Sequence, residues 1–167
     1  DLNMGPSAAD GQGLARLKYL RGDDDNESTG LLFRDRTNVL GDIVHSNPVY
    51  VGKPQHRYPN ADPFGVEGNR YSDFVSKLTN TEDDDYSPRN GIVYVGANDG
   101  MLHGFNESNG TEVMAYVPNA LFSNATGKGL HYLTDPDYAH RYYVDLSPTV
   151  TDVYLNSAWK TILVGGL

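Results

Sequence analysis

The stretch at residues 94–105 reads YVGANDGMLHGF and places two apolar runs around a short turn. Asn, Asp and Gly adopt positive φ angles more readily than other residues, so Asn98-Asp99-Gly100 predicts a tight β-hairpin. The residues that follow turn again at 106–110. We therefore predict an antiparallel meander of three strands, at residues 92–96, 101–105 and 111–117.

His103 is the one histidine in this stretch. Side chains alternate between the two faces of a strand, so His103 shares a face with Met101 and Phe105. The five histidines of the chain show no HExxH or His-x-His spacing, and no G-x-S-x-G nucleophile motif is present. We interpret His103 as a packed core residue with one hydrogen-bond partner, and we expect no catalytic residue.

Further elements are predicted on both sides of the meander. Ser7 and Asp10 resemble a capping box and predict a helix at 7–21. The segment 53–90 is rich in Pro, Asn and Asp and predicts a long loop insertion with a helical turn at 71–78. Short β-rich runs predict strands at residues 31–33, 42–45, 49–51, 141–145, 149–155 and 159–164.

The chain contains an internal repeat. SNPVYVG at 46–52 is similar to LSPTVTD at 146–152, and GIVYVGAND at 91–99 is similar to WKTILVGGL at 159–167. Repeated small antiparallel sheets are typical of β-propellers. We predict an all-β fold, a partial β-propeller of two to three blades with one short N-terminal helix. The expected domains are a helix and acidic loop at 1–30 and an incomplete propeller at 31–167, whose remaining blades we expect outside this sequence.

Charge and composition exclude several classes of function. Two acidic runs, at 23–27 and 82–85, carry most of the net charge of −9, and no basic face opposes them. The charge distribution therefore argues against a nucleic-acid partner, because phosphate binding needs clustered Lys and Arg. The absence of cysteine excludes disulfides and thiolate metal sites. No apolar run approaches the length of a membrane span, and no signal peptide is visible.

The first acidic run is a candidate metal site. Asp23, Asp25 and Glu27 provide oxygens at alternate positions, as calcium loops do, although Ser28 stands where an EF-hand has glycine. The alternative is a solvated loop. The run at 82–85 lacks this alternation.

Arg21-Gly22-Asp23 is a candidate receptor-binding motif, because integrins recognise this tripeptide. The alternative is structural: the tripeptide lies at the predicted end of a helix, where Gly22 would serve as the C-terminal cap.

Three blocks, at 20–52, 93–122 and 140–167, resemble the C-terminal β-propeller of the PilY1/PilC family of type IV pilus tip-associated adhesins and assembly factors. They include FRDRTNVLGDIVHSNPVYVG, VYVGANDGMLHGFNESNGTEV and HRYYVDLSPTVTDVYL. The resemblance implies a cell-surface protein at the pilus tip, outer-membrane associated or secreted, that promotes pilus assembly and opposes retraction. It also implies a calcium loop in the parent protein; no copy is present here, and that loop would lie beyond Leu167.

The functional expectation is a non-enzymatic propeller module. Its expected partners are the pilus and minor pilin machinery, a host or abiotic surface, and the remaining blades of the parent chain. Surface binding would use loops at 21–30 and 53–90, since loops tolerate variation on a rigid sheet. The meander also resembles, more loosely, the blades of quinoprotein (PQQ) dehydrogenases, so an oxidoreductase propeller and a generic envelope-assembly scaffold stand as alternatives.

Overall fold

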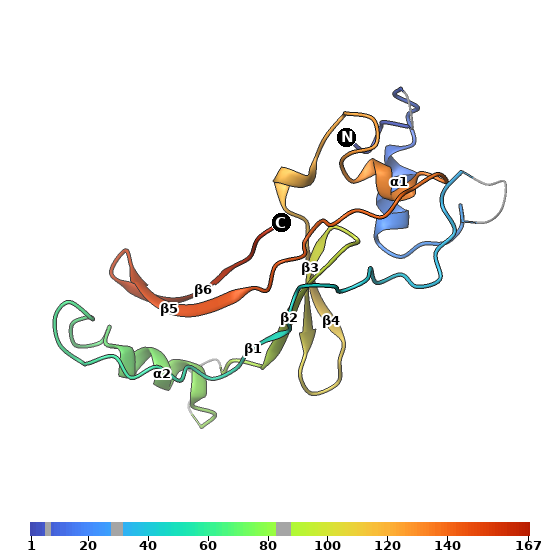
Figure 1. Ribbon diagram of the computed structural model, residues 1–167. Helices are drawn as coiled ribbons and strands as arrows, with labels where there is room; N and C mark the ends of the chain where they lie inside the picture. Colours follow the sequence, from blue (N-terminus) through green and yellow to red (C-terminus); the bar gives the residue numbers. More distant parts are fainter. Residues whose placement is uncertain (6–7, 28–31, 83–87) are drawn as a thin grey trace.

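The computed structural model describes residues 1–5, 8–27, 32–82 and 88–167, and its main elements are two separate antiparallel sheets (Figure 1). The first sheet has the order β1-β2-β3-β4, and the second is the hairpin β5-β6. The strands are β1 (Val49–Val51), β2 (Ile92–Ala97), β3 (Met101–Asn106), β4 (Glu112–Tyr116), β5 (Thr149–Leu155) and β6 (Ala158–Val164). The helices are α1 (Gly13–Leu20), α2 (Tyr71–Thr79) and the 3-10 turns η1 (Asn119–Leu121) and η2 (His131–Thr134). Neither sheet is closed, which confirms the partial propeller, and the helical turn predicted at 71–78 is the helix α2.

The meander at 92–116 forms as predicted, with one difference in its first turn. β2 and β3 pair from Ala97 opposite Met101 to Ile92 opposite Asn106. In the turn between them only Gly100 has a positive φ, of 91°. The prediction of positive φ angles at Asn98 and Asp99 was therefore wrong. A three-residue hairpin loop needs a left-handed residue only at its last position. Asp99 instead closes the turn by accepting a hydrogen bond from the backbone N–H of Met101 at 3.1 Å.

Helix α1 is shorter than predicted, and its first turn is capped by a side chain ten residues earlier in the chain. It begins at Gly13, whose N–H donates to the Asn3 side chain at 2.9 Å. Ser7, the expected cap, lies outside the described residues. Asp10 accepts from the Gln12 N–H and binds Arg16, and hence it does not form the predicted capping box.

Three of the predicted strands do not form. Residues 42–45 and 141–145 contain bends, at 44–45 and 143–144, and belong to no sheet, and residues 32–33 contribute only an isolated bridge from Phe33 to Glu27. Residue 31 is outside the described part of the chain, as is the predicted domain boundary near residue 30. The backbone N–H of His45 donates to the Asp145 side chain and that of Tyr143 to the Asn98 side chain, so side chains take hydrogen bonds that a strand ladder would make.

A small hydrophobic core joins the N-terminal segment to the region after the first sheet. Leu130, Leu133 and Tyr143 are buried together, and Leu2, Leu20, Val117, Leu121 and Tyr138 pack against them. Buried Arg16 reaches Thr134 at 3.0 Å and is held by Asp10. This core anchors α1 beside the turn of the β2-β3 hairpin (Figure 1). None of the described helices is both long enough and apolar enough to cross a membrane.

Candidate functional site

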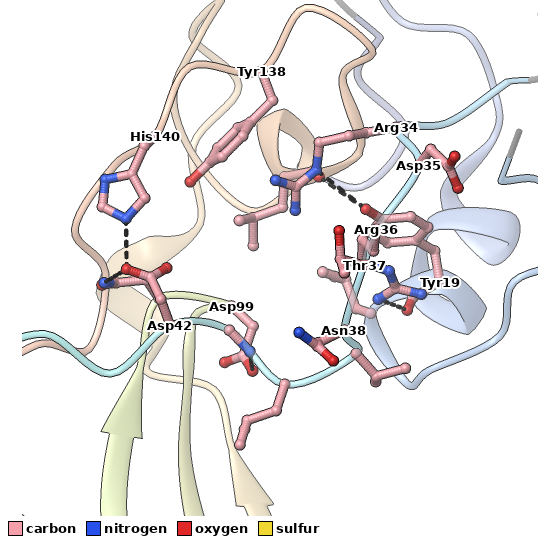
Figure 2. A pocket seen from close by; sticks show the side chains of 16 residues that line it. Tyr19, Arg34, Asp35, Arg36, Thr37, Asn38, Asp42, Asp99, Tyr138 and His140 are labelled. Atoms are coloured by element: carbon pink, nitrogen blue, oxygen red, sulfur yellow. Dashed lines mark hydrogen bonds and ion pairs between the residues drawn. The ribbon is translucent and has the colours of Figure 1, made fainter. Parts of the chain in front are cut away.

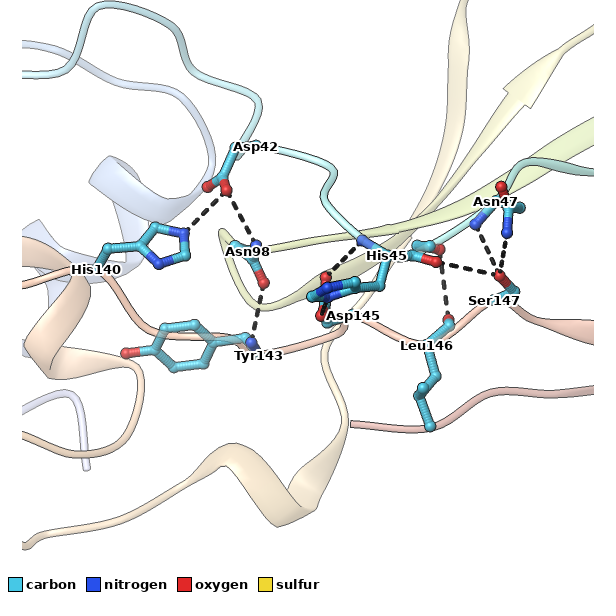
Figure 3. Close-up of polar contacts among 10 residues, drawn as sticks. Asp42, His45, Asn47, Asn98, His140, Tyr143, Asp145, Leu146 and Ser147 are labelled. Carbon is cyan, nitrogen blue, oxygen red and sulfur yellow. Dashed lines mark hydrogen bonds and ion pairs between the residues drawn. The ribbon is translucent and has the colours of Figure 1, made fainter.

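The two repeats meet along a seam in which residues 100 positions apart touch one another (Figure 3). The imidazole of His45 lies within hydrogen-bond distance of the Asp145 carboxylate, which also accepts from the His45 backbone N–H at 3.1 Å. The N–H of Asn47 donates to Ser147 Oγ at 2.8 Å, and that hydroxyl donates to the His45 carbonyl at 3.3 Å. Equivalent positions of the two repeats therefore lie side by side, as in neighbouring blades of a ring.

Ser46 ties the seam to the first sheet. Its hydroxyl accepts from the N–H of Gly96 in β2 at 2.9 Å and donates to the Leu146 carbonyl at 3.4 Å. Glycine is required at 96, because a Cβ there would lie 2.3 Å from the Val144 carbonyl oxygen. The backbone of the second repeat thus rests directly on a strand of the first.

Asn98 joins three segments at the end of the seam. Its side-chain oxygen accepts from the buried Tyr143 N–H at 3.0 Å, and its amide nitrogen donates to Asp42 at 3.2 Å. The Asp42 carboxylate also forms a hydrogen bond with His140 Nε2 at 2.9 Å. Burial opposes ionisation of Asp42, but the hydrogen bonds from Asn98 and His140 hold the pKa of this carboxyl below its ordinary value.

A polar cavity of about 270 Å³ lies between this end of the seam and the segment at 34–42 (Figure 2). Asp42 and His140 line one side, and the Arg34 guanidinium stacks 4.3 Å from the centre of the Tyr138 ring on another. Asp99 contributes a further carboxylate. Side chains of both charge signs line the cavity, so it is suited to holding segments together or binding a polar group.

His103 lies on the face of the first sheet opposite the seam. It lines a groove of about 750 Å³ together with Met101 and Phe105. The shared face was predicted, but the single hydrogen-bond partner was wrong. His103 Nδ1 lies 2.5 Å from Glu112, and Nε2 lies 3.1 Å from Asp99. Burial opposes protonation, yet these two carboxylates raise the pKa of His103 above its ordinary value. The ring also stacks on Phe105 at 5.9 Å, so packing and charge act together.

The residues predicted to bind a metal are not gathered at one point. The Glu27 carboxylate is paired with Arg36 and accepts its backbone N–H at 2.9 Å, and the Glu27 side chain is only 6% exposed. Asp23 accepts the Asp25 N–H at 3.0 Å. Within residues 1–5, 8–27, 32–82 and 88–167 no three potential ligands cluster. Calcium binding by Asp23, Asp25 and Glu27 stays a prediction, and residues 83–85 of the second run lie outside the described part.

The Arg21-Gly22-Asp23 tripeptide forms the predicted helix cap. Gly22 has a φ of 102°, its N–H donates to the Tyr19 carbonyl at 2.9 Å, and the Asp23 N–H donates to the Lys18 carbonyl at 3.0 Å. These two bonds are the Schellman motif. Arg21 remains exposed, and receptor binding by the tripeptide stays a prediction.

Sequence reasoning missed the polar residues that connect the repeats, chiefly Ser46, Asn98 and Ser147. The repeat itself was the available signal, because Ser46-Asn47-Pro48 aligns with Leu146-Ser147-Pro148. It indicated equivalence but not contact. Asn98 was assigned to the turn on its backbone preference, whereas its side chain does the connecting.

Comparison with known proteins adds the family. Residues 40–167 match the family model described as the PilY1 beta-propeller domain. The chain is 42% identical over 172 residues to the type IV pilus biogenesis factor PilY1 of Pseudomonas aeruginosa strain PAK, covering 99% of this chain and 13% of that protein. It is 41% identical over 169 residues to a PilY1 homolog of Xylella fastidiosa strain Temecula1, with the same coverage.

No solved structure shows significant similarity to the chain. The chain spans about 13% of the length of the curated relatives it matches. The open antiparallel sheets, the repeat that stacks on itself at a spacing of 100 residues and the match over residues 40–167 agree with one another. The chain belongs to the PilY1 β-propeller family.

Proposed function

We propose that this chain is a non-enzymatic propeller module of a type IV pilus biogenesis factor. Its relatives carry that name, and the chain covers a small part of each. The module supplies a rigid scaffold that promotes pilus assembly at the cell surface and opposes retraction. Attachment to a host or abiotic surface then uses loops carried by the blades.

The seam carries this proposal. A propeller works as a scaffold when successive blades hold a fixed angle, and the contacts of His45, Asn47 and Ser147 fix that angle between two blades. The polar cavity beside the seam is lined by charged side chains from several segments, among them Arg34, Asp42 and Asp99. These features support a role in presentation and assembly.

The test uses the full-length protein in a piliated bacterium that lacks its own copy. The paired variant Asn47→Ala with Ser147→Ala removes the side-chain contacts between these two positions of the seam, and Lys160→Ala, at an exposed position of β6, is the control. We expect fewer surface pili with the seam variant and normal piliation with the control. Deleting the retraction motor in the same strain should restore the pili if the protein opposes retraction.

Two outcomes would contradict the proposal. Normal piliation and normal retraction with a seam variant whose blades have separated would remove the scaffold role. Quinone-dependent dye reduction by the purified full-length protein would favour the oxidoreductase alternative instead. Repeating the piliation assay with and without calcium tests whether the parent protein uses this ion.

A further inference from the structure

The insertion at residues 53–90 leaves the first sheet after β1 and packs against the second sheet (Figure 1). Its aromatic side chains surround Trp159, the only tryptophan of the chain, which is 7% exposed. Tyr71 and Tyr58 are nearest, with ring centres 4.7 and 4.9 Å from that of Trp159. The Trp159 N–H donates to the Phe64 carbonyl at 3.2 Å. A segment expected to present surface loops therefore has its apolar side covered by β6.

Asp152 of β5 forms the polar centre of this contact. The carboxylate is buried, and one oxygen accepts from the Tyr71 hydroxyl at 2.6 Å while the other accepts from Thr161 of β6 at 2.5 Å. The Tyr58 hydroxyl donates to the Asp152 carbonyl at 3.3 Å. Burial, followed by the bond to Asp152, raises the pKa of Tyr71, so the phenol remains a donor at physiological pH. Each oxygen of the buried Asp152 carboxylate thus accepts a hydrogen bond, and one of the two donors, Tyr71, belongs to the insertion.

The base of the insertion is anchored to both sheets as well. Arg89 donates to the Gly52 carbonyl, just after β1, at 3.1 Å and to Thr161 of β6 at 2.6 Å. Phe74 and Leu78 of α2 line a cavity of about 470 Å³ together with Met114 of the first sheet and Leu163 of the second. Helix α2 therefore lines the cavity between the two sheets, together with residues of both.

We propose that the described residues of the insertion, 53–82 and 88–90, form an inter-blade clamp: they span the gap between the two blades and fix the second blade against the first. A clamp is useful here because the seam contacts are polar and this chain has no cysteine to form a disulfide across the gap. The proposal assigns the aromatic side of the insertion to blade positioning, and it stands independently of the role in pilus assembly.

The test is hydrogen exchange of the full-length protein, read peptide by peptide. Tyr71→Phe removes only the hydroxyl that binds Asp152. We expect exchange to rise about tenfold both at 56–74 and at 149–164, while 92–116 stays unchanged, because a lost bond to a buried charged acceptor opens the segments it joins. Tyr154→Phe makes the same chemical change on the same hairpin and is the matched control.

A cross-link separates clamping from local loosening. The Asn69 side chain reaches the Ser157 carbonyl, so Asn69→Cys with Ser157→Cys should be joined by a short thiol cross-linker. Added to Tyr71→Phe, the cross-link should return exchange at 149–164 to the wild-type rate. The clamp is refuted if Tyr71→Phe leaves 149–164 unchanged, if both tyrosine variants behave alike, or if no cross-linked peptide forms.

Discussion

Replacing Asn98 tests the physical account of the seam most directly. Asn98 is 3% exposed, and its two side-chain bonds reach segments that lie 45 and 56 residues away along the chain. Asn98→Ala removes the acceptor of the buried Tyr143 N–H and the donor to Asp42. Backbone pairing of the β2-β3 hairpin does not depend on this side chain, so the change acts on the connection between repeats.

The magnitude follows from the burial of the two partners. A buried N–H left without an acceptor costs about 1–3 kcal/mol. The lost bond to Asp42 adds only about 0.5 kcal/mol, because that carboxylate is 52% exposed and water replaces the amide. We expect Asn98→Ala to lower the free energy of unfolding by about 1.5–3.5 kcal/mol, which corresponds to a fall in Tm of roughly 3–14 °C for a chain of this size.

Urea unfolding of the purified chain, followed by circular dichroism, measures this change. Asn124→Ala, at an exposed position, is the control and should stay within about 0.5 kcal/mol of wild type. Asn98→Asp sharpens the test: it keeps an acceptor for Tyr143 but places a second carboxylate against Asp42. That variant should be destabilised at pH 7 and recover relative to wild type as the pH falls through about 4. The reasoning fails if Asn98→Ala matches the control.

Three further predictions concern other parts of the fold. Because two carboxylates raise the pKa of His103, its charge stabilises the fold below about pH 6.5 and is lost as the pH rises through the raised folded-state pKa; Tm measured from pH 5.5 to 9 should fall more for wild type than for His103→Gln. Gly96→Ala introduces a Cβ into the seam and should cost about 1–3 kcal/mol in urea unfolding, whereas Gly165→Ala, where a Cβ meets nothing within 4 Å, should be neutral. Glu27→Ala leaves the Arg36 side chain, 8% exposed, without its carboxylate partner and should lower the free energy of unfolding by about 3–5 kcal/mol. A loss of stability that appears only when calcium is present would instead show that this carboxylate binds the cation.

Local patterns were sufficient to predict most of the strands. The β2-β3 hairpin, β5 and β6 follow from apolar runs bounded by turn residues, and the turn between β5 and β6 has Asn156 and Ser157 at φ angles of 52° and 59°, as a two-residue hairpin loop requires. The same patterns failed at 42–45 and 141–145, which have β-rich sequences but no strand partners. Whether a β-rich run joins a sheet depends on which groups lie beside it, and here side chains accept the N–H groups of His45 and Tyr143.

The candidate sites show the same division. The acidic run at 23–27 predicted a group of free carboxylates, but Arg36 reaches back nine residues to pair with Glu27. His103 was placed on the correct face, but its second carboxylate came from the neighbouring strand. Periodicity fixes the face that a side chain occupies and says nothing of which charge the next strand brings to it.

The sequence by itself determined the fold class, the repeat and the glycine at the helix end, because strand alternation, turn φ angles and helix caps are set by residues a few positions apart. Only the tertiary structure decided that the repeats touch at equivalent positions, that Asn98 joins three segments and that the 53–90 insertion lies on the second sheet. Those contacts join residues 45 to 100 positions apart, and they depend on how the sheets stack, which no local pattern encodes.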